Sequence, residues 1–237
     1  MAIYRIAGEF FEMDPESQRL KKQAEKYLYK GEVYPESVTR LYVPRSRIEE
    51  KLQEMPGMTL DGVGYVCYGG RFASELLKKN GFVLHSSAVA YEGNAYLFSA
   101  DSGTGKSTHT AFWQECFGKD KAVIINDDKP AVIERNGVFY AAGTPFSGKT
   151  DMSEDIIVPI KALCFIYRSE KNEIRQIGVS EVLDLVMNQV MVHPKEDDYG
   201  LFLDHLDRFL KKVPVYSFGV TYSAESARFV YEYLKNN

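Results

Sequence analysis

The sequence lacks several features that would indicate a special class of protein. Its three cysteines, Cys67, Cys116 and Cys164, are far apart and lie in apolar contexts, which argues against a disulfide framework or a zinc site. No apolar run is long enough to span a membrane, and no basic-then-apolar leader opens the chain, so we expect a cytoplasmic protein. The formal net charge is −4 without a block of like charge, so neither nucleic acid nor a membrane is an expected partner.

What the chain does have is enough apolar material for a packed core. It contains 237 residues, of which 45% are hydrophobic and 13% aromatic. We expect a small α+β module over residues 1–78 and a larger domain over residues 79–237. In the module, the patterns predict strands at 3–13 and 38–43, helices at 15–30, 47–55 and 72–80, and a turn at 57–64.

The larger domain is predicted to be α/β with a mixed sheet. Residues 82–90 and 95–99 form a predicted hairpin, so the second strand should have an antiparallel neighbour, unlike the strands of a purely parallel nucleotide-binding sheet. A second hairpin is expected at 132–141, around Asn136-Gly137. Further strands are expected at 122–126, 156–167, 174–177 and 213–220, and helices at 108–117, 180–192 with Ser180 as cap, 196–211 and 223–234.

The segment Ala100-Asp-Ser-Gly-Thr-Gly-Lys-Ser-Thr108 lies between a predicted strand and a predicted helix. Glycines at 103 and 105 let backbone N–H groups converge where the positive end of the helix favours an anion, which is typical of a phosphate loop, or Walker A motif. Ala100 departs from that pattern, which begins with Gly. The predicted nucleotide-binding residues are Ser102, Gly103, Thr104, Gly105, Lys106, Ser107 and Thr108.

Two adjacent acids, Asp127 and Asp128, follow the next predicted strand. A carboxylate there, after the helix of a phosphate loop, is expected to face Mg²⁺ or a reacting hydroxyl. Successive side chains of an extended segment point opposite ways, so the two aspartates can have different roles.

A second loop, at residues 143–150, is rich in Gly, Ser and Thr and ends near a lysine. Thr144, Ser147, Gly148 and Lys149 are candidate substrate-binding residues, and an ordinary surface loop is the alternative. Surface positions are the simpler interpretation of Arg45, Arg47 and Arg71. Taken alone, the histidines at 85, 109, 193 and 205 are interpreted as packed or exposed side chains.

Three of these segments together resemble the kinase domain of the HPr kinase/phosphorylase family: Leu-His-Ser-Ser-Ala-Val at 84–89, the loop, and Asn-Asp-Asp at 126–128. The resemblance covers roughly residues 80–165. It implies a fold shared with phosphoenolpyruvate carboxykinases, with a mixed sheet flanked by helices and the phosphate loop at its edge. It also implies that His85 lies in an active site and that Asp127 and Asp128 serve as proton acceptor and metal ligand. The family phosphorylates a serine hydroxyl in a protein or, among relatives, in a small molecule.

The resulting hypothesis is an Mg-ATP-dependent kinase that transfers a phosphate to an alcohol group. Its catalytic residues would be Asp127, Asp128, His85 and Lys106, with Ser107 and Asp128 as metal ligands. The alternatives are a nucleotide-binding regulatory module without catalysis and a carboxykinase-like enzyme. The sequence names neither the acceptor nor the oligomeric state, and it does not choose among ATP, GTP and pyrophosphate.

Overall fold

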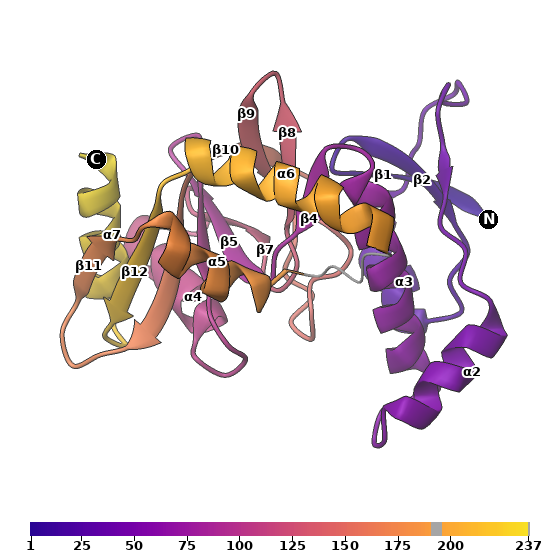
Figure 1. Ribbon diagram of the computed structural model, residues 1–237, viewed down its shortest axis with the longest axis horizontal. Coiled ribbons are helices and arrows are strands. Elements are labelled where there is room, and N and C mark those ends of the chain that lie inside the picture. Colours follow the sequence, from indigo (N-terminus) through magenta and orange to yellow (C-terminus); the bar gives the residue numbers. More distant parts are fainter. Residues whose placement is uncertain (191–195, 237) are drawn as a thin grey trace.

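The structure, a computed structural model, describes residues 1–190 and 196–236. It has a curled mixed sheet of nine strands with helices on both faces, and a separate three-stranded sheet near the N-terminus (Figure 1).

The N-terminal part consists of the small sheet and three α-helices. Strands β1 (Ala2–Ile6) and β2 (Glu9–Met13) form a hairpin, and β3 (Thr39–Arg40) runs parallel to β2. The helices are α1 (Gln18–Ala24), α2 (Arg45–Glu54) and α3 (Leu60–Leu77), and a 3₁₀ turn, η1 (Glu25–Tyr27), follows α1.

Several predictions for this part were wrong in their boundaries. The strand at 3–13 is interrupted by a turn at Ala7 and Gly8, both with positive φ. The helix at 15–30 is shorter, and only two residues of the strand at 38–43 pair. The turn predicted at 57–64 includes Gly57, with a φ of 86°, but is wrong from Leu60 on, where α3 begins; the Thr59 side chain caps this helix by accepting a hydrogen bond from the Gly62 N–H.

The large sheet has the order β4-β8-β9-β10-β6-β5-β7, with β12 on β10 and β11 on β12. Strand β10 pairs antiparallel with β9 through its first residues and parallel with β6 and β12 further on, which confirms the mixed sheet. The strands are β4 (Gly81–Val83), β5 (Ser86–Tyr91), β6 (Asn94–Ser99), β7 (Val123–Asn126), β8 (Ala131–Arg135), β9 (Val138–Ala142), β10 (Ile157–Arg168), β11 (Glu173–Gln176) and β12 (Val215–Val220).

Strands β5 and β6 form the predicted hairpin, with Ala88 opposite Leu97. Strand β6 lies between β10 and β5, so the glycine loop leaves the sheet at the end of an interior strand. The predicted strand at 82–90 is also divided: β4 pairs with β8, and β5 pairs with β6 and β7. His85 lies at this break, where its N–H donates to the Gln189 carbonyl over 2.7 Å.

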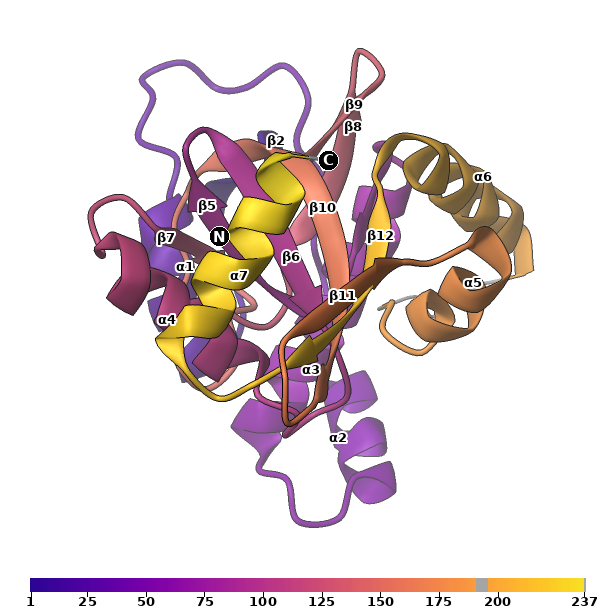
Figure 2. The same ribbon diagram turned by 90° about the vertical axis from the view of Figure 1, so that its left-hand side faces the viewer.

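A different pair of helices covers each face of the large sheet. Helices α4 (Lys106–Phe117) and α7 (Ala224–Lys235) pack together over one face, while α5 (Val179–Met187) and α6 (Glu196–Lys212) lie across the sheet from them (Figure 2). The N-cap of α5 is Gly178 without a side-chain cap, so the predicted cap at Ser180 is wrong. No helix among the described residues is long and apolar enough to cross a membrane.

The N-terminal part and the large sheet share buried apolar contacts. The apolar cluster of the N-terminal part includes residues of β4, β8 and β9, and the rings of Phe72 and Phe146 lie 5.4 Å apart. This contact fixes α3 beside the loop at 143–150. The cysteines at 67, 116 and 164 are all free.

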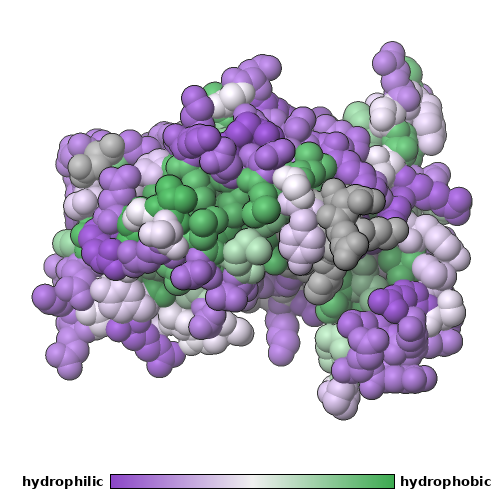
Figure 3. All heavy atoms as spheres, in the orientation of Figure 1, coloured by the Kyte–Doolittle hydropathy of each residue, from purple (hydrophilic) through white to green (hydrophobic). Residues whose placement is uncertain are grey.

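Apolar side chains are also exposed on α5 and α6. Val179, Leu183 and Met187 follow one another at helical spacing and are 60%, 38% and 45% exposed. Figure 3 shows apolar surface over this region of the molecule.

Candidate functional site

The glycine loop joins β6 to α4 and holds Lys106 at the first helical position. Gly103 and Gly105 have φ values of 82° and 114°, the left-handed conformations that glycine adopts readily. A Cβ at Gly105 would lie 2.3 Å from the Tyr222 hydroxyl, so the tyrosine side chain would have to move to admit a larger residue. Lys106 is buried, and its Nζ donates to the carbonyls of Ala100 and Asp101 over 2.7 and 3.3 Å. Burial lowers the pKa of Lys106, and nearby aspartates partly offset this effect.

Distant residues hold the loop in shape. Arg168 donates from Nη2 to the Gly103 carbonyl over 2.9 Å, and the Tyr222 hydroxyl donates to the Thr104 carbonyl. Gln189 donates from Nε2 to Oδ1 of Asp101 over 3.0 Å. Sequence reasoning missed all three residues, since each lies more than 60 positions from its partner and no local pattern marks it.

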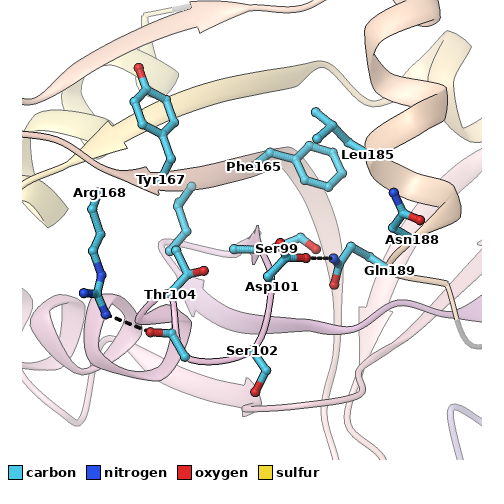
Figure 4. Close-up of a pocket in the computed structure, with 13 residues that line it drawn as sticks. Ser99, Asp101, Ser102, Thr104, Phe165, Tyr167, Arg168, Leu185, Asn188 and Gln189 are labelled. Atoms are coloured by element: carbon cyan, nitrogen blue, oxygen red, sulfur yellow. Dashed lines mark hydrogen bonds between the residues drawn. The ribbon is translucent and has the colours of Figure 1, made fainter.

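A pocket of about 500 Å³ lies on the β10 side of this loop, and we call it the loop pocket. Figure 4 shows Phe165 and Leu185 on one wall and the Asp101–Gln189 hydrogen bond on another. Its rim includes Ser102, Gly103 and Thr104, three of the predicted nucleotide-binding residues. The loop pocket therefore combines an apolar wall with backbone and amide groups that can form hydrogen bonds.

Asp127 and Asp128 follow β7 as predicted, and Asn126 fixes the backbone that carries them. Oδ1 of Asn126 accepts hydrogen bonds from the backbone N–H groups of Asp128 and Lys129 over 2.9 and 2.7 Å. Asp127 is buried, and its carboxylate accepts from the hydroxyls of Ser87 and Thr150 over 2.7 and 3.0 Å. Asn126 thus forms a turn of the kind that Asx residues favour, and it orients both acids.

Asp128 contacts two nitrogen groups. Its Oδ2 lies 2.5 Å from Lys129 Nζ, and its Oδ1 lies 3.4 Å from Nε2 of His85. Nδ1 of His85 is 2.9 Å from Oε1 of Gln189. Because the amide nitrogen of Gln189 already donates to Asp101, its oxygen is the acceptor, and Nδ1 of His85 carries the proton. Neutral His85 therefore presents the Nε2 lone pair toward Asp128.

The charge state of His85 follows from its surroundings. Burial is the largest cause of a lowered pKa, and the positive charge of Lys106 adds to it, while Asp128 acts in the opposite direction. The imidazole is consequently neutral at pH 7. The chain Asp101–Gln189–His85–Asp128 connects the glycine loop to the second acid.

A second pocket of about 430 Å³, the acid pocket, brings distant segments together. Ser107, Asp127 and Asp128 line it, together with residues 147–150 and with side chains of α1 and α3. Gly148 has a φ of 70°, and a Cβ there would lie 2.9 Å from Cβ of Asp128, so the loop packs directly on that acid. Of the predicted substrate residues, Ser147, Gly148 and Lys149 line this pocket.

Other predicted site residues lie elsewhere. Thr144 is fully buried outside the acid pocket, and its hydroxyl donates to the Lys129 carbonyl over 2.7 Å. It anchors the turn after Asp128. Thr108 is exposed on α4 and lines neither the loop pocket nor the acid pocket.

The remaining histidines are structural where the structure describes them. His109 is buried between Trp113 and Ser226, and burial lowers its pKa to about 3. His205 is also buried, with Nε2 3.0 Å from the Leu77 carbonyl. His193 lies outside the described residues. Arg45 and Arg47 form ion pairs with exposed glutamates, and Arg71, itself exposed, pairs with the buried Glu75, so all three arginines are solvated as expected.

The acid pocket has the oxygen donors that Mg²⁺ prefers. Ser107 supplies a hydroxyl, and Asp127 and Asp128 supply carboxylates. The described residues contain no group of three or more His, Cys, Asp or Glu that could enclose a metal ion. Mg²⁺ bound with phosphates uses one or two carboxylates and keeps its other positions for water and phosphate oxygens, so this sparse donor set fits it.

No protein-family model matches the sequence, and no curated protein matches it. A solved structure of the Hpr(Ser) kinase/phosphatase from Coxiella burnetii is similar, with a TM-score of 0.39 and 8% identity over 65% of this chain and 94% of that chain. Such values establish neither membership of a family nor an activity.

Proposed function

We propose that the protein is a kinase that transfers the γ-phosphate of Mg-ATP to an alcohol group. The observation that carries this proposal is the acid pocket, in which Ser107, next to the loop lysine, and the adjacent acids Asp127 and Asp128 line one cavity. Phosphoryl transfer requires phosphates held in place, neutralised charge and a group that accepts the hydroxyl proton. These residue types supply all three.

The glycine loop would hold the phosphates. Its backbone N–H groups and the N-terminus of α4 favour an anion, and Lys106 adds a positive charge beside them. Ser107 and one aspartate would hold Mg²⁺, which supplies further positive charge next to the phosphates when it is bound. The other aspartate would accept the hydroxyl proton, and the Nε2 lone pair of neutral His85, 3.4 Å from Oδ1 of Asp128, would be available to receive a proton from that acid.

The loop pocket would receive the nucleoside of ATP. Phe165 and Leu185 offer apolar surface to a base, and the amides of Asn188 and Gln189 offer hydrogen bonds. The acceptor alcohol would then enter the acid pocket, from the side of residues 147–150. The two substrates would meet at the glycine loop, since Ser102 lines both pockets.

The test is transfer of label from γ-labelled ATP. The protein is incubated with Mg²⁺, labelled ATP and separate metabolite and protein fractions of a cell extract, with Lys106→Ala as the inactive control. We expect a labelled acceptor with the wild type and none with the variant. Nucleotide binding without any labelled acceptor would instead identify a regulatory module, and release of carbon dioxide from oxaloacetate would identify a carboxykinase-like enzyme.

A further inference from the structure

The acid pocket contains two cations without a carboxylate partner. Arg19 of α1 places its guanidinium 4.1 Å from the centroid of the Tyr65 ring, and Lys149 lies at the exposed edge of the pocket. Across the described parts of the chain, neither side chain forms an ion pair, whereas Lys129 in the same pocket is paired with Asp128. Stacking on Tyr65 therefore orients Arg19 without neutralising its charge.

A buried hydroxyl in the same pocket also lacks a partner. Ser147 is fully buried and lines the acid pocket, yet its Oγ makes no hydrogen bond in the structure. Buried hydroxyls of folded proteins are nearly always paired with protein, water or ligand. Ser147 is therefore available to a group that enters the pocket.

The charges of the pocket are separated along its length. Asp127 and Asp128 lie beside Ser107, where the metal and phosphates are proposed to bind. Arg19 and Lys149 also line an adjoining hollow, together with Lys22, Gln23 and Asp151. The hollow has three cations, Arg19, Lys22 and Lys149, against one acid, Asp151, so this end of the pocket, formed by α1 and by the loop at 147–150, is the cationic end.

We infer that this cationic end binds an anionic group of the acceptor, which makes the acceptor a small alcohol that carries a carboxylate or a phosphate. Arg19 and Lys149 would neutralise the anion and Ser147 would donate a hydrogen bond to it, which directs the hydroxyl of the acceptor toward the aspartates. A volume of about 430 Å³ suits a small molecule. This inference rests on the proposed function and assigns acceptor recognition in part to the N-terminal segment.

The experiment measures the unfolding midpoint of the full chain. The first step adds Mg²⁺ and the non-hydrolysable β,γ-imido analogue of ATP, which tests the proposed nucleotide site alone. The second step adds glycerate, glycerol 3-phosphate or glycerol, three probes with a primary hydroxyl of which only the first two are anionic. Both anionic probes should raise the midpoint by about 3 °C or more at roughly tenfold over their dissociation constants, and glycerol should not.

The variant Arg19→Gln/Lys149→Gln should lose the response to the anionic probes and keep the response to the ATP analogue. The control Lys21→Gln/Lys119→Gln, with the same charge change at exposed positions, should keep both responses. The inference would be overturned if the anionic probes do not raise the unfolding midpoint, or raise it no more than glycerol does. It would also be overturned if they raise the midpoint equally in Arg19→Gln/Lys149→Gln. The three probes are also added without nucleotide, so that the anion site is tested independently of the nucleotide site. If the ATP analogue does not raise the unfolding midpoint, the kinase proposal is contradicted.

Discussion

Oδ1 of Asp127 accepts a hydrogen bond from the Ser87 hydroxyl over 2.7 Å, although 40 residues separate the two in sequence. The same hydroxyl lies 2.8 Å from Oγ1 of Thr110 on α4, whose hydroxyl is within hydrogen-bonding distance of the Ser107 carbonyl. Asp127 is therefore connected through two side chains to the helix that begins with Lys106. This connection makes the position of the acid depend on the position of the loop helix.

The single substitutions Asp127→Asn and Asp128→Asn should lower the stability of the fold by different amounts. Asp127→Asn disturbs the hydrogen bonds of a buried carboxylate with the buried Ser87 hydroxyl and with the Thr150 hydroxyl, and should lower the free energy of unfolding by about 1–3 kcal/mol. Asp128→Asn weakens one ion pair, with the half-buried Lys129, and should change the free energy of unfolding less. Chemical denaturation followed by Trp113 fluorescence measures both variants.

The same two variants should differ in kinetics. The variant that removes the proton acceptor should keep its nucleotide affinity while turnover falls by about 10²–10⁴-fold, and the variant that removes the metal ligand should lose both. Full activity in both variants would contradict the assigned roles of the two acids.

Lys106→Ala should abolish stabilisation by Mg-ATP. If Mg-ATP is about a hundredfold above its dissociation constant, the wild type gains ~2.7 kcal/mol, which corresponds to a rise of roughly 5–11 °C in the unfolding midpoint. Lys119→Ala, an exposed lysine near the other end of α4, is the matched control and should respond as the wild type does. An equal rise in Lys106→Ala would show that the nucleotide binds elsewhere.

Turnover should fall in acid because His85 becomes protonated. Its pKa lies below the usual value of about 6.5, so the imidazole is neutral at pH 7 and gains a proton as pH falls through the lowered pKa. The Nε2 lone pair that faces Asp128 is then lost. A pH profile of kcat should show this acid limb in the wild type, while His85→Asn should be slower and lack it; an identical limb in that variant would assign the titration to another group.

His109 should make folding less stable in acid. Its pKa is about 3 in the folded protein and near 6.5 in the unfolded chain, so the unfolded chain binds more protons between these values. Stability therefore rises with pH in this window, and this residue should account for a loss of about 2 kcal/mol between pH 7 and pH 5. Urea denaturation at both pH values should show a smaller loss in His109→Gln than in the wild type, and equal losses would refute the assignment.

Gly148→Ala should impair acceptor phosphorylation through Asp128. The new Cβ would lie 2.9 Å from Cβ of Asp128, in addition to a backbone cost of roughly 1–2 kcal/mol at positive φ. Gly93→Ala is the matched control, since φ is 76° there and nothing lies within 4 Å of the added atom. Both variants should lose similar stability, and only Gly148→Ala should lose about tenfold or more in turnover. Equal turnover in the two would mean that Asp128 tolerates displacement.

Local patterns predicted the centre of this fold better than its periphery. The strand before the glycine loop, helix α4 after it and the strand that ends at Asp127 all have strong short-range signals, and all are present. Helix α3 was predicted to begin twelve residues too late, because its glycines weaken the helical pattern. In the structure Gly64 packs near Ile48 of α2, so tertiary contact compensates for its low propensity.

In the candidate site, too, contiguous motifs could be predicted and contacts between distant segments could not. Asp127, Asp128 and Lys106 could be predicted because their motifs are contiguous. The position of His85 could not, since it depends on the break between β4 and β5 and on Gln189, 104 residues away. Arg19 and Tyr65 reach the acid pocket only because the N-terminal helices pack on the loop at 143–150, and no spacing in the sequence shows that packing.

The hydrogen bonds from Lys106 to the carbonyls of its own loop affect which anions the loop can bind. The carbonyls of Ala100 and Asp101 take two of the three N–H groups of its ammonium, which leaves one N–H for a ligand. A singly charged ion can use that one N–H, whereas a polyphosphate also brings oxygens for the backbone N–H groups of the loop. The loop should therefore favour a polyphosphate over the abundant monovalent anions of the cell.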